Sequence, residues 1–428
     1  MNYRGDNVGL AASYRNILSD ELIMTETDNK LEHLFPVDGI KLSTVEAGIR
    51  YSNRKDLVVF ELSEGSKTVG VFTQNRFCAA PVVLSKKHLD HEVPAYFIIN
   101  TGNANAGTGR QGLQDALRCC EQVAKFADVK VENVLPFSTG VIGENLPIDP
   151  ILNNLPRAFD CFSENAWAAA AEGIMTTDTR PKGASVQIEI DGEKITITGI
   201  AKGAGMIRPD MATMLAFVAT DAKVEQSLLQ DLLNGVVNSS FNRITVDGDT
   251  STNDCLMLTA TGKSGIEISS KDKSIYDTFY KALEDICIQL AKAIVMDGEG
   301  ATKFITINVQ GGKHSQNCLD VAYSVAHSPL VKTAFFASDP NWGRILAAVG
   351  RAPVLDLDVS KIDIFLDDVQ IVKSGELDLE YTEDEGSRVM KQHCITIGIN
   401  LNSGNFSELV WTSDLSHEYV SINSEYRS

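Results

Sequence analysis

The stretch Lys202–Asp221, KGAGMIRPDMATMLAFVATD, joins a glycine-broken loop to an apolar run. Glycine and proline interrupt regular structure, so the chain is expected to turn at the glycines and at Pro209 before it enters a buried segment at 214–218. Thr213 lies at this junction, directly after the small residue Ala212. A threonine hydroxyl is a weak nucleophile unless a base takes its proton, and the α-amine of an N-terminal threonine is one such base. The other interpretation of this stretch alone is a core threonine at the start of a strand or helix.

Short β-like runs alternate with helical patterns on both sides of this stretch. Two of the β-like runs flank Asp191 and Gly192, a pair that strongly favours a hairpin turn. Longer segments with helical periodicity predict helices. The sequence therefore predicts an α/β fold of the layered α+β type, with helices packed on mixed β-sheets. The expected strands are 57–60, 68–73, 95–99, 185–190, 194–200, 255–261, 303–309, 362–372 and 393–401, and the expected helices are 113–126, 158–175, 224–237, 274–296 and 324–336.

Length and composition narrow the class of protein. A chain of 428 residues exceeds the size at which a single core stops growing, so two lobes are expected. Residues 1–35 are polar and acidic with little periodicity, which indicates an N-terminal extension. The chain has no apolar run near the roughly 20 residues that a membrane span needs, so we expect no membrane association. A net charge of −19 argues against a nucleic-acid partner, because binding to phosphates needs a basic surface.

The cysteines and the start of the chain indicate a cytoplasmic protein. The eight cysteines are scattered without a C-x-x-C pair, and the first residues contain no apolar segment of the secretory type. The polar segment 247–254, DGDTSTND, has part of the pattern of a calcium loop. It lacks the central glycine, and Leu258 stands where the bidentate glutamate is needed, so a polar turn is the better interpretation. We expect neither a metal nor a cofactor.

Several loops rich in glycine, asparagine and hydroxyl residues follow the expected strands. They include 100–107, NTGNANAG, and 135–147, LPFSTGVIGENLP, together with the cluster 176–179, TTDT. Small residues with exposed backbone N–H groups at such positions form anion or oxyanion sites. The seven histidines all lie outside these loops, and a threonine activated by its own amine needs no histidine. Plain structural turns are the alternative for each loop.

The longer motifs of the chain resemble those of one known family, the ornithine acetyltransferases (glutamate N-acetyltransferases of arginine biosynthesis). The resemblance extends from about Phe35 to Ser428 and leaves the first residues unexplained; Arg208 and Asp210 also depart from the pattern. It implies a two-lobed α/β fold related to other self-cleaving proteins with an N-terminal nucleophile, such as the DmpA-like aminopeptidases. The motifs that carry it are LPFSTGVIG, IMTTDTRPK, GIAKGAGMIRPDMATMLAF, FNRITVDGDTSTND, VMDGEGATKF, SDPNWGR and INSEYRS.

The resemblance also implies roles for individual residues. Cleavage is expected between Ala212 and Thr213, which gives an α fragment, 36–212 after the extension, and a β fragment, 213–428, in an α2β2 assembly. Thr213 would be the nucleophile, with Thr139 and Gly140 as the oxyanion hole. The residues that match the family's substrate contacts are Thr176 (the spacing leaves Thr177 as an alternative), Lys202, Thr213, Glu299, Asn423 and Ser428.

The implied reaction moves an acetyl group from N2-acetylornithine to glutamate by a ping-pong route without a cofactor. The freed α-amine has an ordinary pKa of about 7.7–8, so part of it is neutral and basic near neutral pH. Lys202 is the natural cation for the α-carboxylate that both substrates carry, and Glu299 the natural partner of the ornithine ammonium. The residues leave open whether acetyl-CoA is a second acetyl donor. Two other functions also stay open, an amidohydrolase or aminopeptidase on the same scaffold and an uncleaved binding protein for an anionic metabolite.

Overall fold

The computed structural model describes residue 31 and residues 34–190, 192–208 and 214–425. The described residues form two compact units, a first unit up to Glu299 and a second unit from Gly300 to Ser424. This division of the chain differs from the expected fragments, whose boundary after Ala212 falls within the sequence of the first unit.

The first unit contains two main β-sheets. The strands of one sheet have the order β1-β2-β4-β5 and those of the other have the order β3-β11-β8-β7-β6. In the first sheet β4 and β5 are parallel, and in the second β8 and β11 are parallel, so both sheets are mixed. The strands are β1 (Ile40–Val45), β2 (Leu57–Leu62), β3 (Lys67–Phe72), β4 (Tyr96–Asn103), β5 (Val134–Val141), β6 (Lys182–Ile190), β7 (Glu193–Lys202), β8 (Leu215–Thr220), β9 (Lys223–Val224), β10 (Ile244–Thr245), β11 (Cys255–Ala260) and β12 (Glu267–Ile268).

The two sheets pack against each other through an aromatic core. The ring of Phe217 on β8 lies 5.2 Å from that of Phe60 on β2 and 5.1 Å from that of Phe137 on β5, between ring centroids. These residues belong to one buried cluster that draws on both sheets. Burial of aromatic rings is a large apolar contribution to stability, so this cluster holds the sandwich together.

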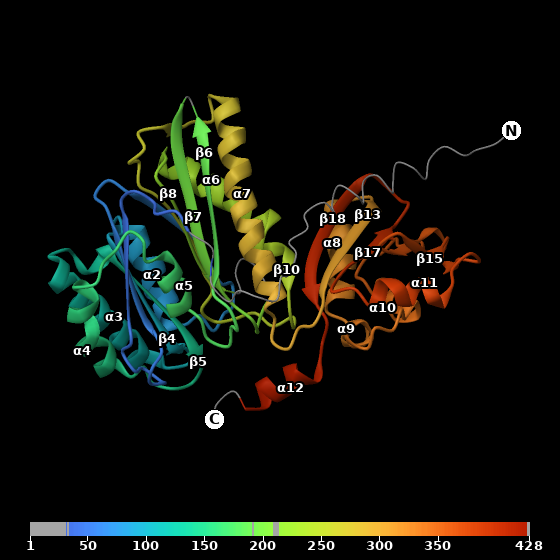
Figure 1. Cartoon of the computed structure of the whole chain (residues 1–428), viewed down its shortest axis with the longest axis horizontal. Coiled ribbons are helices and arrows are strands. Elements are labelled where there is room, and N and C mark those ends of the chain that lie inside the picture. The colour runs from blue at the N-terminus through green and yellow to red at the C-terminus, as the bar shows by residue number, and fades with distance from the viewer. Residues whose placement is uncertain (1–30, 32–33, 191, 209–213, 426–428) are drawn as a thin grey trace. The chain divides into compact units, whose positions relative to one another are not determined.

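Helices cover the outer faces of both sheets, as Figure 1 shows. Helices α3 and α4 pack on the sheet that contains β4 and β5, and α7 packs along β6 and β7 of the other sheet. The layers thus run helix, sheet, sheet, helix, which confirms the expected layered α/β fold. The helices of the first unit are α2 (Ala80–His91), α3 (Gly109–Ala127), α4 (Ile148–Phe159), α5 (Trp167–Gly173), α6 (Gln226–Ser239) and α7 (Lys273–Met296).

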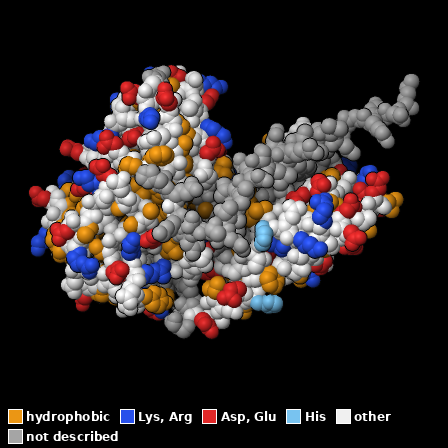
Figure 2. All heavy atoms as spheres, viewed as in Figure 1, with side chains coloured by type: hydrophobic (Ala, Val, Ile, Leu, Met, Phe, Trp, Pro, Cys, Tyr) orange, Lys and Arg blue, Asp and Glu red, His pale blue; other side chains and the backbone are white. Residues whose placement is uncertain are grey.

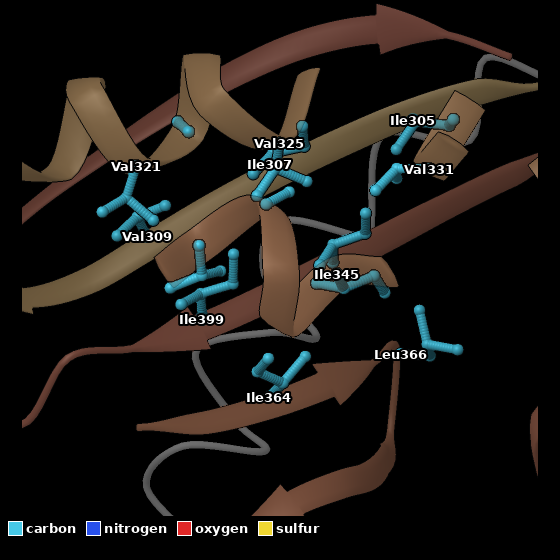
Figure 3. Close-up of a cluster of buried hydrophobic side chains, with 14 of the residues drawn as sticks. Ile305, Ile307, Val309, Val321, Val325, Val331, Ile345, Ile364, Leu366 and Ile399 are labelled. Carbon is cyan, nitrogen blue, oxygen red and sulfur yellow. The ribbon is translucent and has the colours of Figure 1, made fainter. Parts of the chain in front are cut away.

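The second unit is a mixed sheet with helices packed against it. Its strands have the order β18-β13-β17-β14-β15-β16, with β13 parallel to β17 and antiparallel to β18. Figure 3 shows Ile305 and Ile307 of β13 in a buried cluster with Val325 of α8 and Ile345 of α10. The elements are β13 (Phe304–Gly312), α8 (Ser315–Ala326), α9 (Pro329–Phe336), α10 (Trp342–Gly350), β14 (Asp363–Leu366), β15 (Val369–Lys373), β16 (Glu376–Leu377), α11 (Glu383–Met390), β17 (Cys394–Asn400), β18 (Phe406–Ser413) and α12 (His417–Ser424).

Three of the expected elements are wrong in part. The helix expected over 158–175 is interrupted, because Ser163 makes a pair of backbone hydrogen bonds with Leu42 at the edge of β1, 3.0 and 2.9 Å long. The helix expected over 324–336 is two helices, because Ser328 caps α9 and Pro329 begins it. The strand expected over 362–372 is the hairpin β14–β15, with Asp367 in the left-handed region at its turn.

The described surface carries charges of both signs. Figure 2 shows acidic and basic side chains interspersed over the face in view, without a large basic patch. Among the described helices none combines the length and the apolar character that a membrane span requires, including the longest, α7, with 24 residues.

Candidate functional site

Strand β5 is irregular at the expected oxyanion residues, Thr139 and Gly140, which both lie near its end. Thr139 is 7% exposed, and Gly140 has a φ of +133°, a backbone conformation that residues with a side chain rarely adopt. A Cβ atom at position 140 would lie 2.3 Å from the carbonyl carbon of Gly102 on the neighbouring strand β4. Only glycine therefore fits at this place, where the register of β4 and β5 is irregular.

Hydrogen bonds of buried amide side chains hold the backbone at the end of β5 in place. The Nδ2 of Asn253 donates hydrogen bonds to the backbone oxygens of Ala104, 2.6 Å away, and Ser138, 2.8 Å away. The hydroxyl of Ser138 in turn donates to the Oδ1 of Asn100 across 2.5 Å. Because fully satisfied buried networks are rigid, Thr139 follows a backbone that is firmly held.

Lys202 reaches this strand end from the other sheet. It is the last residue of β7, it is half-buried, and its Nζ donates a hydrogen bond to the Oγ1 of Thr139 across 3.0 Å. An ammonium group can donate hydrogen bonds but cannot accept them, so the Thr139 oxygen accepts this bond. The proton of the Thr139 hydroxyl stays available for another acceptor. Burial lowers the pKa of Lys202, and the negative charges of Asp178 and then Asp254 oppose that effect.

A buried ion network connects Lys202 to the threonine cluster. The Oδ1 of Asp178 accepts from the Nζ of Lys182 at 2.6 Å and from the backbone N–H of Gly203 at 2.7 Å, and its Oδ2 accepts from the N–H of Thr176 at 2.9 Å. Although burial alone raises the pKa of Asp178, the charge of Lys182 brings that pKa well below its usual range. Thr176 and the Lys202 loop are therefore tied to one carboxylate.

The same lysine holds a second carboxylate at the end of α7. The Nζ of Lys182 lies 2.5 Å from the Oδ2 of Asp297, which also accepts from the backbone N–H of Thr179 at 3.1 Å. All three side chains of the Asp178–Lys182–Asp297 network are almost fully buried. A buried lysine between two carboxylates is a structural requirement, because removing it would leave Asp178 without its ion-pair partner and Asp297 with only Arg180, whose Nε is 3.8 Å away.

Glu299 lies beside the glycine loop that follows Lys202. Its backbone N–H donates to the carbonyl of Ala204 at 2.8 Å, and its side chain is 8% exposed. Its carboxyl group packs directly on Gly205, where a Cβ atom would come within 2.5 Å of the carboxyl carbon. The negative charge of Glu299 also acts on Lys202.

The structure thus brings together five of the expected site residues, Thr139, Gly140, Thr176, Lys202 and Glu299. Ala212 and Thr213, the expected cleavage site and nucleophile, lie outside the described residues, as does Ser428. Asn423 lies exposed on α12 in the second unit, where its Nδ2 donates to the carbonyl of Tyr419 at 2.9 Å.

Four polar residues of this region were not expected from the sequence, Asp178, Lys182, Asn253 and Asp254. Asp178 belongs to the hydroxyl cluster 176–179, and Asn253 and Asp254 end the polar segment 247–254. The density of polar residues in these two stretches could have indicated that they belong to the site. In this segment, Asp247 accepts hydrogen bonds from the backbone N–H groups of Met206 at 2.6 Å and Ile207 at 2.9 Å. Within the described ranges, no three His, Cys, Asp or Glu side chains are grouped to hold a metal ion.

Fold and site together define a layered α/β enzyme in which the hydroxyl of Thr139 and the half-buried lysine Lys202 meet between two sheets. The sequence pattern of the ArgJ family matches residues 41–428. The chain therefore belongs to the ArgJ family, and the resemblance that the motifs indicated is confirmed.

One curated relative agrees with this assignment, and two solved structures are similar to parts of the chain. The chain is 59% identical over 399 residues to the arginine biosynthesis bifunctional protein ArgJ of Pseudomonas syringae pv. tomato, covering 93% of this chain and 98% of the relative. The crystal structure of the ArgJ protein of Bacillus halodurans is 39% identical, with a TM-score of 0.48, over 50% of this chain and 99% of that one. The structure of ornithine acetyltransferase complexed with ornithine from Mycobacterium tuberculosis is 31% identical, with a TM-score of 0.36, over 41% and 93%.

Proposed function

We propose that this chain transfers the acetyl group of N2-acetylornithine to glutamate through an acetyl ester on Thr213, after self-cleavage between Ala212 and Thr213. The family assignment supports the pathway, and the name of one relative, ornithine acetyltransferase, supports the donor. The observation that carries the proposal is the hydrogen bond from Lys202 to Thr139, because it leaves the Thr139 proton available for another acceptor beside Gly140, whose φ is +133°.

In the first half-reaction the Thr213 oxygen attacks the acetyl carbonyl of acetylornithine. Its proton passes to the free α-amine of the same residue. The negative oxygen of the tetrahedral intermediate accepts hydrogen bonds from the Thr139 hydroxyl and the Gly140 N–H. The C–N bond then breaks, and the α-ammonium of Thr213 returns the proton to the departing ornithine nitrogen.

In the second half-reaction the amine of glutamate attacks the acetyl-threonine ester. The C–O bond to Thr213 breaks, its oxygen regains a proton, and N-acetylglutamate leaves. Lys202 binds the α-carboxylate that both substrates carry, and Glu299 binds the side-chain ammonium of ornithine. We assign the remaining substrate contacts to Thr176, Asn423 and Ser428.

The same ester explains how acetyl-CoA could serve as a second donor, since any acetyl group that reaches Thr213 is passed on to glutamate. The names of the curated relatives, which call them bifunctional, support this extension. We further propose an α2β2 assembly of the two fragments and a cytoplasmic location. Neither a cofactor nor a metal takes part in the steps above.

The cleavage is tested first by denaturing electrophoresis and mass spectrometry of the purified protein. Wild-type protein gives the fragments 1–212 and 213–428, whereas Thr213→Ala stays a single chain and transfers no acetyl group. Thr213→Ser keeps part of both activities, because serine retains the hydroxyl. An active, uncleaved Thr213→Ala protein would contradict the proposal.

Product analysis separates transfer from hydrolysis. With acetyl-labelled acetylornithine and glutamate, the transferase gives labelled N-acetylglutamate. When glutamate is absent, it converts added labelled ornithine into labelled acetylornithine at the expense of unlabelled acetylornithine. An amidohydrolase on the same scaffold gives free acetate at the same rate with and without glutamate.

A further inference from the structure

Arg54 is a half-buried arginine that the reaction described above does not use. It lies in the loop between β1 and β2, far from the threonine cluster in sequence. Its Nη2 donates hydrogen bonds to two successive backbone oxygens, those of Met175 at 2.5 Å and Thr176 at 3.0 Å. Hydrogen bonds from a charged donor are stronger than those between neutral groups. Arg54 therefore holds the backbone at Thr176, one of the expected substrate contacts.

The loop that carries this arginine is itself anchored beside the oxyanion strand. Both carboxylate oxygens of the buried residue Asp56 accept hydrogen bonds within the loop, from the backbone N–H groups of Ala47 and Ile49, each at 2.6 Å. The backbone oxygen of Asp56 accepts from the N–H of Thr101 on β4 at 2.9 Å. Thr101 in turn pairs with Thr139 on β5. The base of the loop is therefore fixed next to the expected oxyanion residue.

Asp178 holds the other side of the Thr176 backbone. Its Oδ2 accepts from the N–H of Thr176 at 2.9 Å, and its Oδ1 accepts from the N–H of Gly203 at 2.7 Å. Gly203 directly follows Lys202, whose Nζ donates to the Oγ1 of Thr139 at 3.0 Å. Thr176 is thus connected to Thr139 a second time, through the other sheet.

The two connections form a closed network that begins at Thr139 and ends at Thr176. One side passes through β4 and Arg54, and the other passes through Lys202 and Asp178. Fully satisfied networks of this kind are rigid, because each hydrogen bond restrains the next. The network therefore fixes three expected site residues relative to one another, and removing Arg54 leaves Thr176 held on one side only.

The hydroxyl of Thr176 is the part of this residue that the network leaves unused. Its N–H and its backbone oxygen are both engaged, whereas its Oγ1 makes no hydrogen bond to any residue that the structure describes. Thr177, the alternative substrate contact, has neither its backbone N–H nor its backbone oxygen bonded to a described residue. Of the two threonines, Thr176 is thus the one whose backbone position is set.

We propose that Arg54 is a positioning residue, which holds the Thr176 backbone so that the Thr176 hydroxyl, and not that of Thr177, meets the substrate. Positioning has large effects in active sites, because a displacement of about 1 Å can cost a factor of about 10² in rate. The effect on the substrate rests on the proposed function, whereas the effect on the Thr176 backbone does not.

The hold on the backbone can be measured without substrate. Hydrogen exchange, read by mass spectrometry of peptides that contain Thr176, reports how often its N–H is released. Arg54→Met removes both hydrogen bonds but keeps a long side chain, and it speeds this exchange by about tenfold or more, the factor expected for the loss of a charged hydrogen bond. The control is Lys55→Met, which removes the exposed ion pair with Glu172, 2.8 Å long, and leaves the exchange unchanged. Unchanged exchange in folded Arg54→Met protein would refute the proposal.

A double-mutant cycle tests whether Arg54 acts through the threonine hydroxyl. Arg54→Met raises KM for acetylornithine by about tenfold and leaves kcat within about twofold, as expected when an interaction shared by substrate and transition state is weakened. In a Thr176→Val background the same change has little further effect, because valine has no hydroxyl to misplace. In a Thr177→Val background, the matched control, the full effect of Arg54→Met persists.

Two outcomes of the cycle would overturn the proposal. An equal effect of Arg54→Met with and without the Thr176 hydroxyl would show that Arg54 is only structural, and an effect that disappears in Thr177→Val instead would assign the contact to Thr177. Should Arg54→Met not fold, Arg54→Lys carries the same comparisons with a smaller effect, because it keeps the charge but not the planar guanidinium. If the wild type transfers no acetyl group, the proposed function fails, and the exchange experiment still decides whether Arg54 holds Thr176.

Discussion

The Nζ of Lys202 and the Oγ1 of Thr139 form a 3.0 Å hydrogen bond that joins the two sheets of the first unit. Lys202 ends β7, and Thr139 lies near the end of β5, so the bond connects two strand ends. It fixes the direction of both groups: the lysine donates, the threonine oxygen accepts, and the threonine proton is left for a third atom. The proposed oxyanion role of Thr139 therefore depends on the charge of its neighbour.

The first prediction concerns this hydroxyl. Thr139→Val keeps the shape of the side chain but removes the proton, so kcat for acetyl transfer falls by about 10²–10³ while KM changes little. Thr139→Ser retains the hydroxyl and most of the activity. Steady-state kinetics with both substrates measures this. A Thr139→Val enzyme with normal kcat and raised KM would mean that the hydroxyl binds substrate instead.

The fold could be predicted wherever its signals are local in sequence. The hairpin β6–β7 was expected over 185–190 and 194–200 because Asp191 and Gly192 favour a tight turn, and the two strands pair over a slightly longer range, from Lys182 with Ala201 to Ile190 with Glu193. The break between α4 and α5 was missed, because it is made by the pairing of Ser163 with Leu42, a contact between residues distant in sequence.

The residues of the candidate site likewise fall into those that local motifs predicted and those that depend on contacts between distant parts of the chain. Thr139, Gly140 and Lys202 were expected from motifs, and the structure places them together, although their roles stay predictions. The importance of Asp178 and Asp254 could not be predicted, because it depends on which charged side chains become buried neighbours in the fold. The sequence alone does not show these contacts. Thr213 and Ser428 lie outside the described residues, so their expected positions stay predictions too.

The second prediction concerns the backbone at Gly140. Gly140→Ala must place a Cβ atom 2.3 Å from the Gly102 carbonyl carbon and adopt a φ of +133°, so β4 or β5 has to move. We expect a loss of about 3 kcal/mol or more in the free energy of unfolding. The matched control is Gly65→Ala, where φ is +87° but the space is open, which costs about 1–2 kcal/mol. Urea denaturation compares the two; equal losses would show that the contact with Gly102 is relaxed.

The third prediction concerns the buried lysine between Asp178 and Asp297. Lys182→Met leaves Asp178 without its ion-pair partner and Asp297 with only Arg180, 3.8 Å away, and costs about 3–5 kcal/mol of stability at neutral pH. The exposed pair Lys55–Glu172, 2.8 Å apart, provides the control, because Lys55→Met costs less than about 1 kcal/mol.

The stabilities of wild type and Lys182→Met are expected to depend on pH in opposite directions. In wild type the pKa of Asp178 is lowered in the folded state, so its contribution to stability is complete above about pH 4, its unfolded pKa, and is lost as pH falls toward the folded value. In Lys182→Met the buried carboxylates of Asp178 and Asp297 lower the stability of the folded state as long as they are charged, and protonation at low pH removes this effect. The stability gap between wild type and Lys182→Met therefore narrows below about pH 4, whereas a gap independent of pH would mean that lost packing, not charge, is the cause.

The last prediction concerns the amide that supports the strand end. The Nδ2 of Asn253 donates to two backbone oxygens, those of Ala104 and Ser138, so Asn253→Asp turns a double donor into a buried anion facing two acceptors. We expect a loss of about 3 kcal/mol or more in stability and a lowered kcat, since Thr139 follows Ser138 directly. Asn234→Asp is the matched control, because the Oδ1 of Asn234 only accepts, from Gln230 at 3.0 Å on the exposed face of α6, and an aspartate accepts equally well. It stays within about 0.5 kcal/mol of wild type. If Asn253→Asp were as stable and active as Asn234→Asp, the hydrogen bonds of Asn253 would not be needed to hold Ser138 and Thr139 in place.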